Sequence, residues 1–195
     1  MLGAMTAPHC RRARRGFTLV ELMVVLAIMA VLAAIAVPAL RGYIARQRVE
    51  GVAQELVTDL RYLRSLQMQR NETVAIGFGS NTAVTCYVLY TLGNELGSCD
   101  CTRNGPACST NVPGAQEELK VVRLPRSDGV SISANPTVLM VGRNNLPLNG
   151  VTLRTTVSST LGGTVRVSTN AAMLPDLCSV SGPESTLKAC PPPPP

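Results

Sequence analysis

The sequence of 195 residues has few of the groups that enzymes use for proton transfer or nucleophilic attack. It contains a single histidine, His9, and its two lysines are Lys120 and Lys188. No G-x-S-x-G motif is present, and Gly162-Gly163 precedes a predicted strand, whereas a phosphate-binding glycine loop leads into a helix. We therefore expect no catalytic activity, no cofactor and no metal centre.

The C-terminal part of the chain also lacks an excess of charge of either sign. Residues 71–195 contain eight basic and eight acidic side chains. The formal net charge of +6 comes from residues 1–16, with four arginines and no acid, and from residues 41–70, with six arginines and three acids, less the one negative charge of Glu21 between them. Strong general affinity for nucleic acid normally requires a basic patch on the working domain. Composition therefore does not favour DNA as a partner.

One long stretch, residues 17–40, is almost entirely apolar, and Glu21 is its only charge. As a helix it would be about 36 Å long, enough to cross a bilayer core of about 30 Å. A buried core helix would normally show a polar stripe, which is missing after Glu21. Ala33-Ala34-Ile35-Ala36 loosely resembles a signal-peptide cleavage site, but helical sequence continues beyond Pro38. We expect the stretch to be retained as a single membrane span.

Four arginines precede this stretch: Arg11, Arg12, Arg14 and Arg15. Clustered arginines beside an apolar span remain on the cytoplasmic side of the membrane. The rest of the chain should therefore lie on the outer side of the membrane.

The pattern after Pro38 predicts an amphipathic helix over residues 44–70. Its apolar positions recur every three or four residues and form one face: Val49, Val52, Leu56, Leu60 and Leu63. Proline lacks a backbone N–H, so Pro38 should bend the helix near the membrane surface without ending it. Asn71 marks the predicted end.

The pattern from residue 71 onward alternates and predicts short strands separated by Gly, Pro, Asn and Asp turns. The predicted strands are 72–79, 84–92, 118–124, 130–133, 137–141, 151–156 and 163–168. A long helix followed by a run of strands indicates an α+β fold, in which the helix packs on a C-terminal antiparallel sheet domain. Five prolines, 191–195, form a predicted extended tail.

The chain has seven cysteines, of which Cys10 lies in the basic N-terminal segment. The other six fall in the part expected to face an oxidising compartment: Cys86, Cys99, Cys101, Cys108, Cys178 and Cys190. An even number in that compartment predicts disulfides, and six cysteines allow fifteen pairings. Cys178 and Cys190 would close a C-terminal loop, and the other four would tie the second strand to a loop. A zinc site built from those four is the alternative, although their spacing does not match paired C-x-x-C motifs.

Residues 15–40, RGFTLVELMVVLAIMAVLAAIAVPAL, resemble the N-terminal signature of type IV prepilins and type II secretion pseudopilins. The resemblance implies that a prepilin peptidase removes residues 1–16 after Gly16 and methylates the new terminus at Phe17. It also implies that Glu21 meets the amino terminus of a neighbouring subunit and sets the register of assembly. The alternative is that Glu21 simply lies at the interface and touches water.

Residues 41–78 are similar to the stem and first strand of the GspH/FimT branch, in which an Arg-Asn pair, here Arg70-Asn71, leads into a strand. Some FimT-like minor pilins bind DNA through a Gly-Arg-x-Arg motif near the C-terminus. The corresponding stretch, 165–179, lacks that motif, and Arg143 and Arg166 are the candidate contacts that remain. Fewer arginines mean fewer neutralised phosphates and weaker binding.

These observations predict a minor pilin or pseudopilin that is anchored in the inner membrane and assembles with other pilins. The predicted segments are a leader (1–16), a transmembrane and assembly segment (17–40), an amphipathic half-helix (41–70), a β-rich periplasmic domain (71–190) and the proline tail (191–195). The alternatives are a pilus-associated DNA-binding subunit and a stand-alone anchored envelope protein.

Overall fold

The computed structural model describes residues 16–93, 99–108, 116–144, 146–148, 150–180 and 187–191, with the backbone alone at 38 and 39. The chain divides into two compact units, residues 1–40 and 41–195. Apart from Gly16 and Pro191, the predicted leader and proline tail lie outside the described residues.

Helix α1 spans Leu19–Arg70. Pro38 lies inside it and does not end it, and the bend expected there remains a prediction. The helix ends where predicted, because Asn71 adopts a φ of 54° and donates its backbone N–H to the carbonyl of Gln67 at 2.9 Å. Asparagine tolerates this left-handed conformation better than most residues, which makes it a suitable helix terminator.

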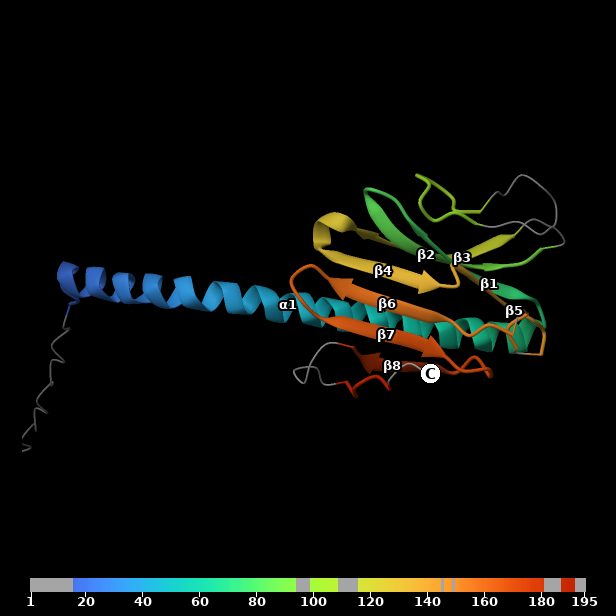
Figure 1. The fold of residues 1–195 in the computed structure, drawn as a ribbon. Helices are drawn as coiled ribbons and strands as arrows, with labels where there is room; N and C mark the ends of the chain where they lie inside the picture. Colours follow the sequence, from blue (N-terminus) through green and yellow to red (C-terminus); the bar gives the residue numbers. More distant parts are fainter. Residues whose placement is uncertain are drawn as a thin grey trace, which may run out of the picture. The chain divides into compact units, whose positions relative to one another are not determined.

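Among the described residues of the second unit, eight strands and one short 3-10 helix follow α1 (Figure 1). They are β1 Val74–Ser80, β2 Val84–Thr91, β3 Glu117–Pro125, η1 Arg126–Asp128, β4 Val130–Asn135, β5 Val138–Val141, β6 Arg154–Ser159, β7 Thr164–Thr169 and β8 Pro175–Ser179. They form two antiparallel four-stranded sheets, ordered β3-β2-β1-β5 and β4-β6-β7-β8. The α+β class and the antiparallel pairing match the prediction, whereas the division into two sheets was not predicted.

The main core lies between both sheets and the part of α1 after residue 40. The predicted helix face is buried at Val49, Leu56, Leu60 and Leu63, and Val52 is partly buried. Side chains from both sheets complete this core, among them Ile76, Leu89, Val157 and Val167. Burying apolar side chains of this size is worth about 1.5–3 kcal/mol each, so this interface holds the helix on the sheets.

The first sheet is covered on both faces. Tyr87 and Leu89 of β2 point into the main core, and their neighbours Val88 and Tyr90 belong to a second apolar cluster with the described residues 99–108. Successive side chains of a strand point to opposite faces. Because both faces of the sheet are covered, β2 is buried continuously from Thr85 to Thr91. A strand with one exposed face would instead alternate between apolar and polar residues.

Strand β8 was missed by the sequence analysis. Pro175 and Asp176 open it, and both residue types are depleted in strands. The structure accommodates the proline because β8 stands at the end of its sheet and Pro175 is its first residue.

Candidate functional site

The start of α1 is capped by Thr18. Its Oγ1 accepts a hydrogen bond from the backbone N–H of Glu21 at 3.2 Å. A threonine side chain at this position satisfies one of the N–H groups that the first turn leaves unpaired. Glu21 lies in that first turn, where the helix dipole favours a negative charge. The cap therefore fixes the helix start close to Phe17, the residue expected to become the new amino terminus.

The segment that follows the cap is uncovered. Every side chain from 16 to 37 is exposed, including large apolar groups such as Phe17, which is 84% exposed, and Leu32. The helix is long and apolar enough to cross a membrane, and the most apolar window of the described residues is 0% buried. An apolar surface of this extent marks an interface with lipid or with other protein chains.

The other half of α1 is joined to the first sheet by a charged cluster. Lys120 Nζ in β3 lies 2.8 Å from Glu55 Oε1 and 2.9 Å from both carboxylate oxygens of Asp59 in α1. Desolvation disfavours the charged form of Lys120, but its hydrogen bonds to the two carboxylates outweigh that effect and raise its pKa. The cluster is a structural clamp between the helix and the first sheet.

All six candidate cysteines are paired. The disulfides are Cys86–Cys101, Cys99–Cys108 and Cys178–Cys190. The first ties β2 to the loop that covers the first sheet, the second closes a ring within that loop, and the third ties β8 to the C-terminal segment. The alternative zinc site is not supported, because its four sulfurs are consumed by two disulfides, and no cluster of potential metal ligands occurs among the described residues.

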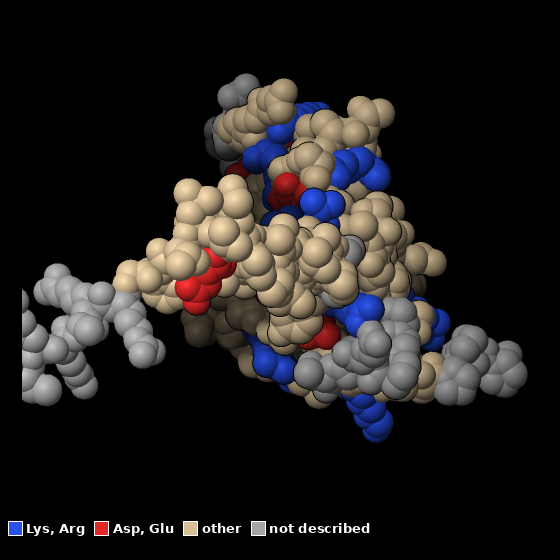
Figure 2. Space-filling view, turned by 90° about the vertical axis from the view of Figure 1, so that its left-hand side faces the viewer, with Lys and Arg blue, Asp and Glu red and all other residues tan. Residues whose placement is uncertain are grey.

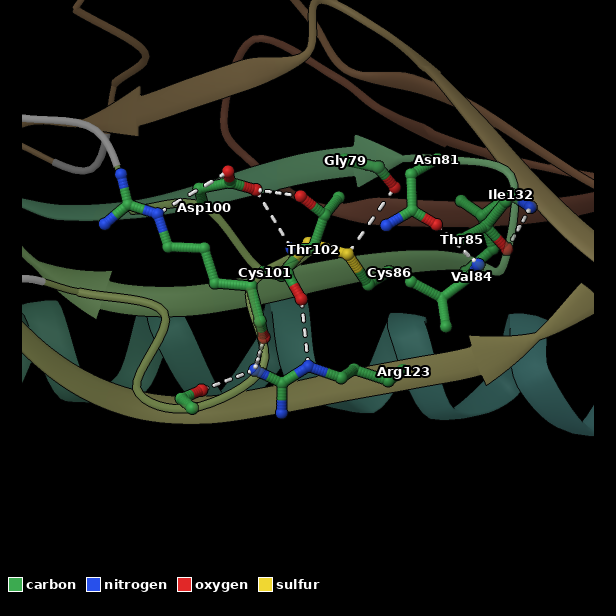
Figure 3. The surroundings of a disulfide bond; sticks show 12 residues. Gly79, Asn81, Val84, Thr85, Cys86, Asp100, Cys101, Thr102, Arg123 and Ile132 are labelled. Atoms are coloured by element: carbon green, nitrogen blue, oxygen red, sulfur yellow. Dashed lines mark hydrogen bonds and ion pairs between the residues drawn. A yellow bond between two sulfur atoms is a disulfide. The ribbon is translucent and has the colours of Figure 1, made fainter.

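Arg123 of β3 fixes the described part of the disulfide loop (Figure 3). Its guanidinium donates to the carbonyl oxygens of Cys101, Arg103 and Gly105 at 2.9, 3.1 and 2.7 Å. The planar guanidinium presents several donors in a fixed arrangement, which suits it to this multiple contact. It therefore holds the loop from β3, in addition to the Cys86–Cys101 disulfide that holds it from β2.

Gly79 of β1 allows the Cys86–Cys101 disulfide to approach the sheet. A Cβ at this position would lie 2.9 Å from Thr102 Cγ2 and 3.1 Å from Cys101 Sγ. Real Cβ atoms do not reach the first of these distances without a shift of their surroundings. The loop can therefore lie this close to the strand only because residue 79 has no side chain.

The candidate DNA contacts are not on one element. Arg143 is exposed in the loop after β5 of the first sheet, and Arg166 is half-buried in β7 of the second sheet. The described residues also line two shallow grooves, one of about 430 Å³ between α1 and β8 and one of about 360 Å³ between β1 and β4. Arg143 and Arg166 line neither groove.

Sequence reasoning missed the roles of Thr18 and Arg123. The spacing Thr18-x-x-Glu21 is a capping-box pattern and marks a helix start, so the sequence did contain a signal for the cap. Arg123 has no comparable signal, because its partners are three backbone carbonyls whose positions depend on the fold of the loop.

Residues 11–37 match the family model described as the prokaryotic N-terminal methylation motif. The fold is also similar to two crystal structures of the type IV minor pilin FimU from Pseudomonas aeruginosa. One, in space group P21, is 13% identical, with a TM-score of 0.47, over 69% of this chain and 91% of that chain. The other, in space group P65, is 14% identical, with a TM-score of 0.42, over 66% of this chain and 90% of that chain.

Proposed function

We propose that this type IV pilin-like chain is a minor pilin or pseudopilin, anchored in the bacterial inner membrane before it is assembled into a filament. The observation that carries the proposal is the uncovered apolar segment within the methylation motif. Its side chains from 16 to 37 are exposed, and Glu21 is its only charge. A membrane covers such a segment before assembly, and the helices of neighbouring subunits cover it afterwards.

The chain is processed by prepilin peptidase between Gly16 and Phe17 and is methylated at Phe17. Glycine at the last leader position lets the peptidase approach the backbone without a side chain in the way. The cut removes Arg11, Arg12, Arg14 and Arg15 together with His9. The remaining chain is nearly neutral and keeps the six paired cysteines.

Glu21 then pairs with the positively charged terminus of a neighbouring subunit. An ionised carboxylate in the membrane costs about 2.5–3.5 kcal/mol near the middle of a span, and pairing it with an ammonium group relieves both charges. Thr18 supports this role, because its cap holds Glu21 in the first turn of the helix, next to the processed end. The subunit acts structurally and has no catalytic role.

Processing can be tested by co-expressing the chain with a prepilin peptidase and measuring its intact mass. The expected product lacks residues 1–16 and carries one methyl group. Gly16→Phe should block the cut, and Gly42→Phe, at a glycine with open space around it, serves as the control. A Gly16→Phe chain that is still shortened at Phe17 would refute the assigned cleavage site.

Assembly can be tested separately, by cross-linking in cells and identifying the co-purified pilins. Glu21→Ala should be processed normally but recover far fewer pilin partners than the parent chain. Glu72→Ala, an exposed carboxylate beyond the helix, is the matched control. Equal recovery with Glu21→Ala would favour a stand-alone anchored envelope protein.

Within the GspH/FimT branch we place residues 41–78 closer to the pilus side, and on that basis we propose a type IV pilus rather than a type II secretion system. Deleting the gene and scoring piliation and protein secretion separately tests that choice. The DNA-binding alternative is not favoured, because Arg143 lies in the loop after β5 and Arg166 lies in β7 of the other sheet, and because residues 71–195 carry no net charge. The DNA-binding alternative would be favoured again if the full chain bound DNA and the double variant Arg143→Ala with Arg166→Ala did not.

A further inference from the structure

The end of the second unit that begins at Arg41 is basic. Two exposed arginines, Arg41 and Arg48, lie in the first turns of α1 within this unit, and exposed Arg126 and Lys188 come from η1 and the C-terminal segment. With the exposed Tyr43 and Leu161 they form a surface that we call the basal face. Figure 2 views the molecule from this side and shows more Lys and Arg than Asp and Glu around it.

Direct contacts bring these distant segments to the same stretch of α1. Arg48 Nη1 donates to the backbone carbonyl of Asp128 at 3.4 Å, which places η1 beside the helix. The β6–β7 turn lies equally close, because a Cβ on Gly163 would be 3.2 Å from Cγ of Arg46.

The C-terminal segment joins them through β8. The Ser179 N–H donates to the Lys188 carbonyl at 2.9 Å, and the Val180 N–H donates to the Thr164 carbonyl at 2.9 Å. Lys188 therefore lies beside the start of β7, next to the same turn. Among the described residues of the basal face, Asp128 is the exposed carboxylate that opposes the four exposed cations.

The β6–β7 turn presents an apolar side chain at this face. Leu161 is 62% exposed at the tip of the turn. Its N–H donates to Ser159 Oγ at 3.3 Å, and the Ser159 N–H donates to the Gly163 carbonyl at 3.1 Å. Gly162, with a φ of 107°, supplies a conformation that other residues rarely adopt. The turn is therefore held in a shape that exposes a leucine among cations.

Chain connectivity places the start of this face, Arg41, next to the proposed membrane span. Arg41 directly follows the apolar span predicted to end at Leu40, and the helix rises about 8 Å from Arg41 to Arg46. The headgroup layer of a bilayer is about 5–7 Å thick on each side of the hydrocarbon core. Exposed cations with a tyrosine and a leucine are the composition found at membrane–water interfaces.

We propose that the basal face binds the anionic phospholipid surface of the membrane that anchors the helix. The cations contact lipid phosphates, and Leu161 inserts among the headgroups. This contact orients the second unit on the membrane until the subunit is extracted into a filament. The proposal rests on the membrane anchoring proposed above.

The absence of tryptophan from the chain allows a direct test, because one introduced indole is the only one present. The full chain with Leu161→Trp is reconstituted into vesicles of phosphatidylcholine alone or with phosphatidylglycerol, with brominated lipid as the quencher. The indole emission should shift to the blue, and its quenching should be about twofold greater or more when the anionic lipid is present. Added salt should weaken this effect.

Leu148→Trp is the matched control. Leu148 is 56% exposed and donates its N–H to Met140 of β5, at the end of the unit where α1 finishes. Its indole should not be quenched. Two basal substitutions, Arg41→Ser and Lys188→Ser, added to the Leu161→Trp chain should reduce its quenching to the level of Leu148→Trp. Two distal substitutions added to the same chain, Arg143→Ser and Arg154→Ser, should leave its quenching unchanged.

Flotation of the vesicles at high salt separates this proposal from the anchoring itself. In one outcome the chain floats with the vesicles while the indole of Leu161→Trp is quenched no more than that of Leu148→Trp. That result overturns the lipid contact alone and indicates a protein partner for the basal face. Quenching that does not depend on the anionic lipid also overturns it. A chain that does not float overturns both proposals.

Discussion

The hydroxyl of Tyr87 in β2 donates a hydrogen bond of 2.7 Å to Asp59 Oδ2 in α1. The same carboxylate contacts Lys120 of β3, so the buried Asp59 is held by one neutral donor and one cation. Burial raises the pKa of Tyr87, and the hydrogen bond to Asp59 raises it further, which keeps the donor protonated. This arrangement fixes the position of the first sheet along the helix.

Replacing Lys120 with methionine should destabilise the domain. The change keeps most of the side-chain volume but leaves Asp59 without its cation, and removing one partner of a buried pair is costly. Because Lys120 is partly exposed, we expect a loss of about 1–3 kcal/mol in the free energy of unfolding. Lys188→Met, at an exposed site, should change it by less than about 0.5 kcal/mol. Denaturant unfolding of both variants measures the difference, and equal midpoints would contradict the role of the clamp.

The contribution of Lys120 should also depend on pH. Its pKa is raised in the folded state, so its stabilisation is complete below the ordinary lysine value of about 10.4 and is lost as the pH rises through the raised value. The stability difference between the parent chain and Lys120→Met should therefore be constant near neutral pH and shrink in strong alkali. Unfolding curves recorded without reductant across this range test the sign. If the stability difference between the two chains grew as the pH rose, the assigned effect of Lys120 protonation on stability would be wrong.

Gly79→Ala should be destabilising, although alanine is normally favoured over glycine. The new Cβ would meet Thr102 Cγ2 and Cys101 Sγ, and relieving such overpacking typically costs about 1–3 kcal/mol. Gly51→Ala in α1 is the control, because a Cβ at this position would meet nothing within 4 Å and the helix should gain about 0.5–1 kcal/mol. Thermal unfolding should show opposite shifts for the two variants, and shifts of the same sign would refute the steric argument.

Arg123→Ala should loosen the loop over the first sheet. Three carbonyl oxygens lose their donor, and hydrogen bonds to charged groups are worth about 1.5–3 kcal/mol when buried but less at this partly exposed site. Amide hydrogen exchange at residues 101–105 should accelerate, whereas exchange in β7 should not. Arg154→Ala, at an exposed position in β6, should leave the loop unchanged. Unaltered loop exchange in Arg123→Ala would mean that the disulfides alone hold it.

The sequence predicted the helix and most strands because their signals are local. The periodic face from Val49 to Leu63 and the terminating Asn71 can be read from neighbouring residues. Strand β8 lacks such a signal, since Pro175 and Asp176 disfavour strands and only its place at the sheet edge makes them acceptable.

The site was predictable to the extent that its chemistry lies in a short motif. Glu21 and the methylation signature occupy one contiguous stretch, whereas the pairing of Cys86 with Cys101 depends on how a loop folds over a sheet. Six cysteines allow fifteen pairings, so their number alone could not select it. The basal face is equally non-local, because Arg48, Arg126 and Lys188 come from three separate segments.

The order of the first two disulfides along the chain has a consequence for proteolysis. Cys86–Cys101 and Cys99–Cys108 overlap, so every peptide bond from residue 86 to residue 108 lies within at least one closed covalent ring. A protease that cuts once in this region yields two fragments still joined through sulfur, which migrate as one chain until a reductant is added. A subunit displayed outside the cell would thus stay in one piece after a single nick there.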